Sequence, residues 1–186
     1  MKKGLNIMGW NLKTDRLLLR EINEENLDFL MELKTRPETN KYENGGIPSN
    51  DSIIEHCHLL IEKAELLPEE GAIMYAVYNA KDEMIGDVHL NCNWKETGEW
   101  EIGYGFLCEY WGNGYATEAV KTVIEFAFKK LHIHKLMAFI NAENIRSVAL
   151  AKRIGMVQEG HMREGRLVDG KWNDEFVFTL LKTDLK

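Results

Sequence analysis

Apolar and polar positions along the first part of the chain follow a strand pattern and then two helical patterns. Residues 16–22 (RLLLREI) form an apolar run that predicts a first strand. Asn23 follows this run and predicts the cap of a short helix. Ser52 and Glu55 have the spacing of a capping box, so we expect a longer helix to begin at Ser52 and to continue to Ala64.

The middle of the chain predicts three strands. Residues 73–80 (IMYAVYNA) and 84–92 (MIGDVHLNC) are apolar runs with a turn between them, and residues 99–108 have a third strand pattern. Because the three runs are joined by short connections, we expect an antiparallel meander.

The clearest helical pattern lies between Ala116 and Leu131, where one apolar stripe recurs at helical spacing. A buried strand is expected next, at residues 135–141 (KLMAFIN). A strand, a helix and a strand in this order imply a right-handed crossover between neighbouring parallel strands. Asn144 predicts the cap of a second helix, and Asp169-Gly170 predicts a hairpin. The expected fold class is therefore mixed α/β, with a largely antiparallel sheet.

Composition places the chain among soluble globular proteins. It has 186 residues, 45% hydrophobic and 28% charged, which fits a single domain over residues 1–186 with a core of about residues 14–183. The net charge of -7 disfavours direct nucleic-acid binding. No apolar run reaches the length of a membrane span, and the first residues do not resemble a signal peptide. We expect a cytoplasmic protein that has no membrane contact.

A metal site is not expected. The three cysteines form no CxxC pair, which disfavours both a disulfide framework and a thiolate zinc site. His56, Cys57 and His58 are neighbours in a helical pattern, so their side chains point in different directions.

Gly112 and Gly114 stand immediately before the best helical pattern. The first amides of a helix have no internal partner, and a bare backbone at that point forms a cradle for phosphate. A Walker loop is excluded because no Gly-Lys-Ser/Thr follows. The dinucleotide fingerprint GxGxxG fails as well, since its third glycine position is Thr117 or Cys108.

Three segments together resemble one family. EIGYGF, WGNGYATEA and NAENIRSVALAKRIGMVQEG are similar to motifs of the GCN5-related N-acetyltransferases (GNAT), and most similar to the ribosomal-protein N-terminal acetyltransferase group. The resemblance extends from TDRLLLREI to FTLLK, nearly the whole chain. It implies the GNAT fold, in which a parallel strand pair is splayed around the cofactor and about four helices flank the sheet. It also implies acetyl-CoA as co-substrate and no metal.

The resemblance implies a set of cofactor-binding residues. A backbone pairing with the pantetheine arm is implied for the end of the strand, at Phe106, Leu107 and Cys108. The pyrophosphate loop would be Trp111, Gly112, Asn113, Gly114, Tyr115 and Ala116, with amides through Thr117 as donors. Trp111 stands where the superfamily pattern has Gln or Arg. Asn144 and Ser147 match the family's Asn-x-x-Ser.

The resemblance also leaves one catalytic role open. Ala151 stands where many relatives carry a tyrosine that protonates the departing thiolate, so Ser147 or water is expected in that role.

Direct attack on a thioester in a ternary complex requires a neutral amine. At pH 7 this costs about 4.6 kcal/mol for a lysine-like amine of pKa ~10.4 and about 1 kcal/mol for an α-amine of pKa ~7.8. Glu101 is the candidate base, with Glu99 on the same strand face.

Three functions stay open at this point. The leading hypothesis is an acetyltransferase for a protein N-terminus of the ribosomal type. A second enzyme hypothesis changes the acceptor to a polyamine or an aminoglycoside. The third is a non-catalytic acyl-CoA-binding module. The amine-bearing acceptor is the expected partner, and the chain is expected to be a monomer or a homodimer.

Overall fold

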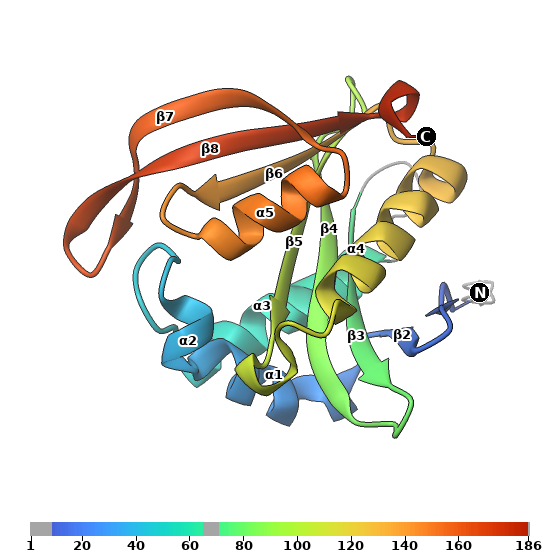
Figure 1. Cartoon of the computed structure of the whole chain (residues 1–186). Helices are drawn as coiled ribbons and strands as arrows, with labels where there is room; N and C mark the ends of the chain where they lie inside the picture. Colours follow the sequence, from blue (N-terminus) through green and yellow to red (C-terminus); the bar gives the residue numbers. More distant parts are fainter. Residues whose placement is uncertain (1–8, 65–70, 186) are drawn as a thin grey trace, which may run out of the picture.

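The computed structural model describes residues 9–64 and 71–185. Its centre is an eight-stranded sheet in the order β1-β2-β3-β4-β5-β6-β8-β7 (Figure 1). Among the described strands only the β5–β6 pair is parallel, which confirms the expected mixed sheet. The strands are β1 (Leu12–Lys13), β2 (Leu17–Glu21), β3 (Ala72–Asn79), β4 (Met84–Trp94), β5 (Glu99–Phe106), β6 (Lys135–Asn141), β7 (Val157–Val168) and β8 (Lys171–Leu181).

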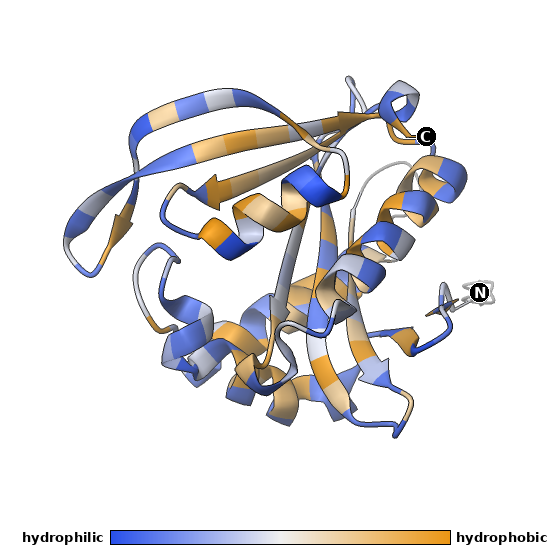
Figure 2. Ribbon diagram, viewed as in Figure 1, coloured by the Kyte–Doolittle hydropathy of each residue, from blue (hydrophilic) through white to orange (hydrophobic). Residues whose placement is uncertain are grey.

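Helices cover both faces of the sheet. Those in the described part of the chain are α1 (Leu27–Thr35), α2 (Pro37–Asn40), α3 (Asn50–Ala64), α4 (Tyr115–Phe126) and α5 (Ile145–Arg153). Apolar residues of α1 and α3 share one buried cluster with β3, while α4 and α5 share a larger cluster with the opposite face. Along α4, hydrophobic and hydrophilic colours alternate at the spacing of an amphipathic helix (Figure 2). None of the described helices is long and apolar enough to cross a membrane.

Strand β3 explains why two apolar cores form. Successive side chains of a strand point to opposite faces. Ile73, Tyr75 and Val77 belong to the cluster under α4, and the residues between them, Met74 and Ala76, belong to the cluster under α1 and α3. Both faces of β3 are therefore buried, in agreement with its nearly continuous apolar sequence.

Two predicted helix starts have different outcomes. The Asn23 side chain accepts a bond of 2.9 Å from the amide of Glu25, so the cap is confirmed, although the first turn is 3-10 and α1 begins at Leu27. The capping box at Ser52 is wrong. The carbonyl of Ser49 accepts the first helical bond and its hydroxyl accepts the amide of Ser52 at 3.2 Å, so the helix is capped three residues earlier.

The predicted meander, crossover and hairpin are confirmed. β3, β4 and β5 pair antiparallel in order, and α4 connects the parallel strands β5 and β6. The last turn of that helix widens into a π-turn at Ala127–Leu131. Asp169 and Gly170 have positive φ angles of 48° and 76°, as a type I′ turn requires.

Strands β5 and β6 separate after a short contact. They pair at three positions, the last of which joins Glu101 to Met137. Beyond these positions the two strands diverge (Figure 1), while β6 continues to pair with β8 on its other side. We call the opening between residues 102–106 of β5 and 138–141 of β6 the fork. It is the splayed parallel pair that the resemblance implied.

Candidate active site

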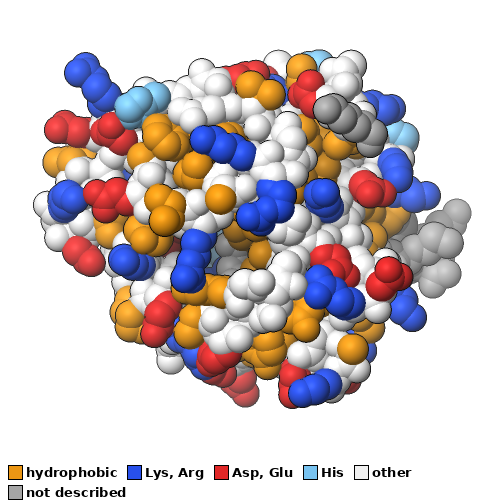
Figure 3. Space-filling model, viewed as in Figure 1, with side chains coloured by type: hydrophobic (Ala, Val, Ile, Leu, Met, Phe, Trp, Pro, Cys, Tyr) orange, Lys and Arg blue, Asp and Glu red, His pale blue; other side chains and the backbone are white. Residues whose placement is uncertain are grey.

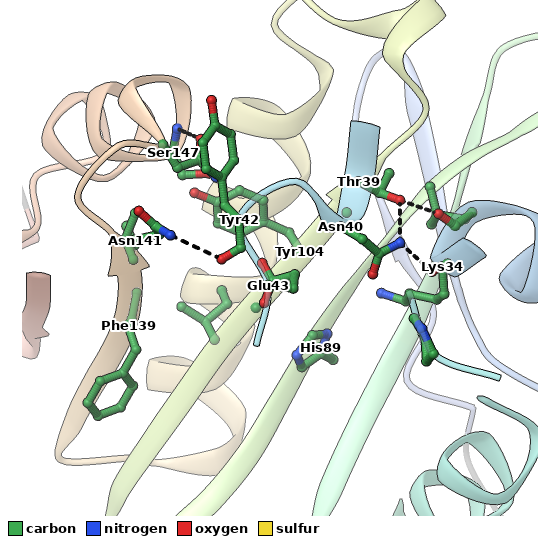
Figure 4. A pocket seen from close by; sticks show the side chains of 18 of the residues that line it. Lys34, Thr39, Asn40, Tyr42, Glu43, His89, Tyr104, Phe139, Asn141 and Ser147 are labelled. Carbon is green, nitrogen blue, oxygen red and sulfur yellow. Dashed lines mark hydrogen bonds between the residues drawn. The ribbon is translucent and has the colours of Figure 1, made fainter. Parts of the chain in front are cut away.

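The fork opens into a pocket of about 400 Å³. Its walls come from α1, α2 and the segment after it, α3, the strands β3 to β6, the start of α5 and one residue of β7 (Figure 4). Three of the residues with a predicted role in catalysis or cofactor binding line it, namely Glu101, Asn144 and Ser147. The strands and helices thus bring together side chains that lie more than 40 positions apart.

The glycine-rich loop lies at the far end of β5, between a 3-10 turn at Cys108–Tyr110 and α4. Gly112 and Gly114 both have φ of 81°, a conformation that costs little only for glycine. The first backbone bond of α4 runs from the amide of Glu118 to the carbonyl of Gly114 at 3.0 Å. The amides of Tyr115, Ala116 and Thr117 therefore have no partner within the helix and suit an anion.

Arginine side chains surround this first turn. Arg16 donates to the carbonyl of Asn113 at 3.1 Å, and Arg153 donates to the hydroxyl of Thr117 at 3.1 Å. The Arg146 guanidinium lies 4.5 Å from the centre of the Trp111 ring. Lysine and arginine side chains extend across the middle of this face of the molecule (Figure 3). Arg16 is also paired with Glu118 of α4, so the charge that adds to the helix N-terminus in favouring an anionic ligand comes from Arg146 and Arg153.

Trp111 connects the loop to the strand. Its indole nitrogen donates to the carbonyl of Phe106 at 2.8 Å. Trp111, which replaces the Gln or Arg of the superfamily pattern, thus holds the loop against the end of β5. The amide of Leu107 donates to Ile85 on β4 at 3.0 Å, and thus points away from the fork. Because backbone groups alternate in direction along a strand, the amides of Phe106 and Tyr104 point toward the fork. Cys108 follows in the 3-10 turn.

Asn144, Ser147 and Tyr104 meet at the fork. The Asn144 side chain accepts from the amide of Ser147 at 3.2 Å, which confirms the predicted cap of α5. The Tyr104 hydroxyl is buried close to Ser147 and forms no hydrogen bond of good geometry with the described residues. Burial raises the pKa of Tyr104, and the Ser147 hydroxyl offsets part of the rise. Ala151, one turn further along α5, is buried and has no proton to give.

Glu101 lies where the parallel pairing ends. Its carboxylate accepts from the side-chain amide of Asn93 at 3.0 Å. Asn93 stands between Cys92, which pairs with Trp100, and Trp94, which pairs with Glu99. The hydrogen bond therefore draws the Glu101 carboxylate toward the start of β5, on the side away from the fork.

A buried polar cluster in the pocket was missed by sequence reasoning. The carboxylate of Asp87 is fully buried, with the Lys34 ammonium at 2.6 Å and His89 Nδ1 at 3.3 Å. Burial raises the pKa of Asp87, but Lys34 and His89 outweigh it, so the pKa lies below its ordinary value. The available signal was an aspartate within the apolar run MIGDVHLNC, where a charge needs a buried partner.

Helix α3 adds His56 and Cys57 to the same part of the pocket. Burial lowers the pKa of His56, and the nearby His89 and Lys34 lower it further, so His56 is neutral near pH 7. Burial raises the pKa of the Cys57 thiol. The described residues contain no group of three or more His, Cys, Asp or Glu side chains arranged to hold a metal ion.

The segment after α2 forms one wall of the pocket and is attached to the terminal hairpin. Arg166 of β7 donates to the carbonyl of Tyr42 at 3.3 Å and pairs with Glu43 at 2.9 Å. Asn141 donates to the same carbonyl at 3.4 Å. Arg166 also pairs with the buried Glu175. These bonds give the pocket a wall whose position depends on β7 and β8.

Similarity to known proteins is consistent with this geometry. Residues 16–157 match the family described as Acetyltransferase (GNAT) domain. The uncharacterized N-acetyltransferase p20 of Bacillus licheniformis is 31% identical over 175 residues, which cover 93% of this chain and 97% of that protein.

Two further proteins differ in acceptor. The [ribosomal protein uS5]-alanine N-acetyltransferase of Escherichia coli is 32% identical over 83 residues, 45% of this chain and 43% of that protein. A Vibrio cholerae spermidine N-acetyltransferase, solved in complex with CoA and spermine, has the same fold with a TM-score of 0.79. It is 22% identical, and the match covers 92% of this chain and 98% of that chain.

Proposed function

This chain belongs to the GNAT acetyltransferase family and is an N-acetyltransferase, and on that premise we propose that it acetylates the α-amine of a protein N-terminus, of the ribosomal type, with acetyl-CoA as donor. The pocket beside the fork would hold the acceptor, and the fork and the glycine-rich loop would hold the donor. The reaction is direct attack of the amine on the thioester in a ternary complex.

The charge balance of the pocket carries the proposal. Its lining contains two cationic side chains, Lys34 and Arg166, and two carboxylates, Glu43 and Glu101. Arg166 neutralises Glu43, and Lys34 is directed at the buried Asp87. A polyamine carries several positive charges and needs an excess of carboxylates, which the described residues of this lining do not offer. A peptide N-terminus brings a single ammonium and a neutral backbone.

The same acceptor also makes the smaller demand on catalysis. An α-amine of pKa ~7.8 is substantially neutral near pH 7, whereas an aliphatic amine of pKa ~10.4 is almost wholly protonated. The Glu101 carboxylate lines the pocket and would attract the ammonium into it.

Donor binding would use the groups found at the other end of β5. The amides of Tyr115, Ala116 and Thr117, with Gly112, Asn113, Gly114 and the surrounding arginines, suit the pyrophosphate. Amides of Phe106 and Tyr104 point into the fork and suit the pantetheine arm and the thioester oxygen. Ser147 would supply a hydroxyl to the departing sulfur, and the Tyr104 hydroxyl is close to that of Ser147.

The experiment is a thiol-release assay with acetyl-CoA and four acceptors. These are a peptide with a free N-terminus, the same peptide with its α-amine blocked, spermidine, and an aminoglycoside. Thiol release only with the free peptide supports the proposal. Release with spermidine or the aminoglycoside moves the acceptor to small amines. Acetyl-CoA binding with no release on the whole panel would point to the non-catalytic module.

A further inference from the structure

We propose that His89 is the base that takes the proton from the acceptor amine, held in place for this by Asp87 and Lys34. The inference rests on the proposed function, because it assumes an amine acceptor in the pocket. Figure 4 shows the His89 side chain on the strands that form the floor of the pocket.

The position of the imidazole follows from the strand register. His89 of β4 is paired with Gly103 of β5, and a Cβ atom added at Gly103 would overlap His89 Nε2. Nε2 therefore lies over the bare backbone of Gly103. This position is two residues beyond Glu101, where the parallel pairing ends. The imidazole thus stands at the entrance to the fork, where a thioester in the fork and an amine in the pocket would meet.

Asp87 determines which nitrogen of the ring is available. An ionised carboxylate only accepts hydrogen bonds, so the nitrogen that faces it, Nδ1 at 3.3 Å, must carry the proton. Nε2, which lies over the backbone of Gly103, then carries the free lone pair. Lys34 bonds the second carboxylate oxygen of Asp87 at 2.6 Å and keeps this buried group ionised. Gly105 leaves the space that this pair needs, since a Cβ there would lie 3.0 Å from Asp87 Oδ1.

Other charged and titratable groups face the same pocket from every surrounding element. They are Lys34 from α1, Tyr42 and Glu43 from the segment after α2, His56 and Cys57 from α3, Glu101 and Tyr104 from β5, and Arg166 from β7. His56 is neutral, and Glu43 is paired with Arg166. Glu101 is the only one of these carboxylates in the described residues that is left to compete with His89 as base. Its hydrogen bond to Asn93 draws it away from the fork.

Nε2 of His89 takes one proton from the ammonium, which leaves a neutral amine and an imidazolium. The amine nitrogen forms a bond to the thioester carbonyl carbon, and the carbon–sulfur bond breaks. The second proton of the new amide nitrogen goes to the sulfur, which leaves as the thiol. His89 then releases its proton to solvent.

The test compares His89→Ala with Glu101→Gln across the pH range, with the free-N-terminus peptide as acceptor. We expect His89→Ala to lower kcat/KM near pH 7 by roughly a hundredfold, the lower range for general-base catalysis. The loss should narrow as the pH rises above ~8, because the peptide amine is then already neutral. Added imidazole should restore part of the rate at pH 7. Glu101→Gln should keep the native shape of the pH profile.

Two observations separate a catalytic role from a structural one. A purely structural effect would lower the rate equally at all pH values and would not respond to imidazole, and that outcome would overturn the inference. So would a pH profile that changes in Glu101→Gln and not in His89→Ala. Acetyl-CoA affinity, measured by calorimetry, should be unchanged in His89→Ala, which confirms that the variant is folded.

A second variant tests the role of His89 by displacing its imidazole. Gly103→Ala places a methyl group against Nε2 and should shift the imidazole, with the same pH-dependent loss as His89→Ala.

Failure of the inference is distinct from failure of the proposed function. If the native protein acetylates the peptide and both variants match it, His89 is not the base. If the native protein does not acetylate any α-amine, the acceptor itself is wrong.

Discussion

The Lys34 ammonium lies 2.6 Å from the carboxylate of Asp87, whose side chain has no exposed surface. Removing one partner of a buried ion pair leaves an uncompensated charge and is strongly destabilising. We therefore expect Lys34→Met to lower the free energy of unfolding by about 3 kcal/mol, at the lower end of the range for such pairs because Lys34 itself is 27% exposed. Urea unfolding followed by circular dichroism would measure it.

The control is a variant in which neither charge is present. Lys34→Met combined with Asp87→Leu should recover part of the lost stability, because well-packed apolar residues often replace a buried pair without loss. If the double variant is less stable than Lys34→Met alone, burial of a lone charge is not the cause.

The ion pair between Lys34 and Asp87 also predicts how the free energy of unfolding depends on pH. The folded-state pKa of Asp87 is lowered, so its ionised form contributes stability above the unfolded-state pKa of ~3.9 and loses it as the pH falls through the lower folded value. The difference in unfolding free energy between the native protein and Asp87→Asn should be constant from about pH 5 to pH 8 and should shrink below about pH 4. A difference that grew on acidification would contradict this sign.

Substitution of Gly114 tests the anion cradle. Valine at a φ of 81° is strained, and the loop must shift to relieve it. We expect Gly114→Val to weaken acetyl-CoA binding at least tenfold by calorimetry. Gly170→Val is the matched control, since Gly170 has a similar φ of 76° but lies in the turn between β7 and β8. The control should lose stability and keep its affinity. Equal affinities in both variants would remove the loop from the binding site.

Tyr104 and Tyr75 offer a second matched pair. Both hydroxyls are buried without a hydrogen bond of good geometry to the described residues, but Tyr75 packs in the main core and Tyr104 lines the pocket. Phenylalanine at either position removes an unsatisfied group and should leave stability unchanged or raise it by up to about 1 kcal/mol. Only Tyr104→Phe should lower the rate of acetyl transfer in the thiol-release assay. An equal effect of the two variants would exclude Tyr104 from the chemistry.

Much of the fold could be predicted because its signals are local. The apolar stripe before Leu131, the alternation of β3 to β5 and the Asp169-Gly170 turn each act within a few residues of chain. The start of α3 is a case in which local signals do not suffice. Ser49 and Ser52 are three positions apart and both suit a helix cap, and the sequence pattern alone does not distinguish them.

The polar cluster of the pocket could not be predicted in the same way. Lys34 and Asp87 are 53 positions apart and meet only because α1 packs over β4. His89 has the alternation of an ordinary strand residue, and its role depends on a glycine in the neighbouring strand. Asp87 alone gave a signal, since a carboxylate in an apolar run requires a partner, but the run does not say which.

The divergence of β5 from β6 has a consequence for the abundance of the protein in the cell. Under the proposed binding mode, coenzyme A occupies the place of a missing strand, so part of the sheet is completed by a metabolite. A ligand that binds only the folded chain adds about 2.7 kcal/mol at a hundred times its dissociation constant. When the acyl-CoA pool falls, this contribution declines, and the open strand edges are exposed to proteases and to other unpaired strands. The abundance of the enzyme would then follow the supply of its own donor.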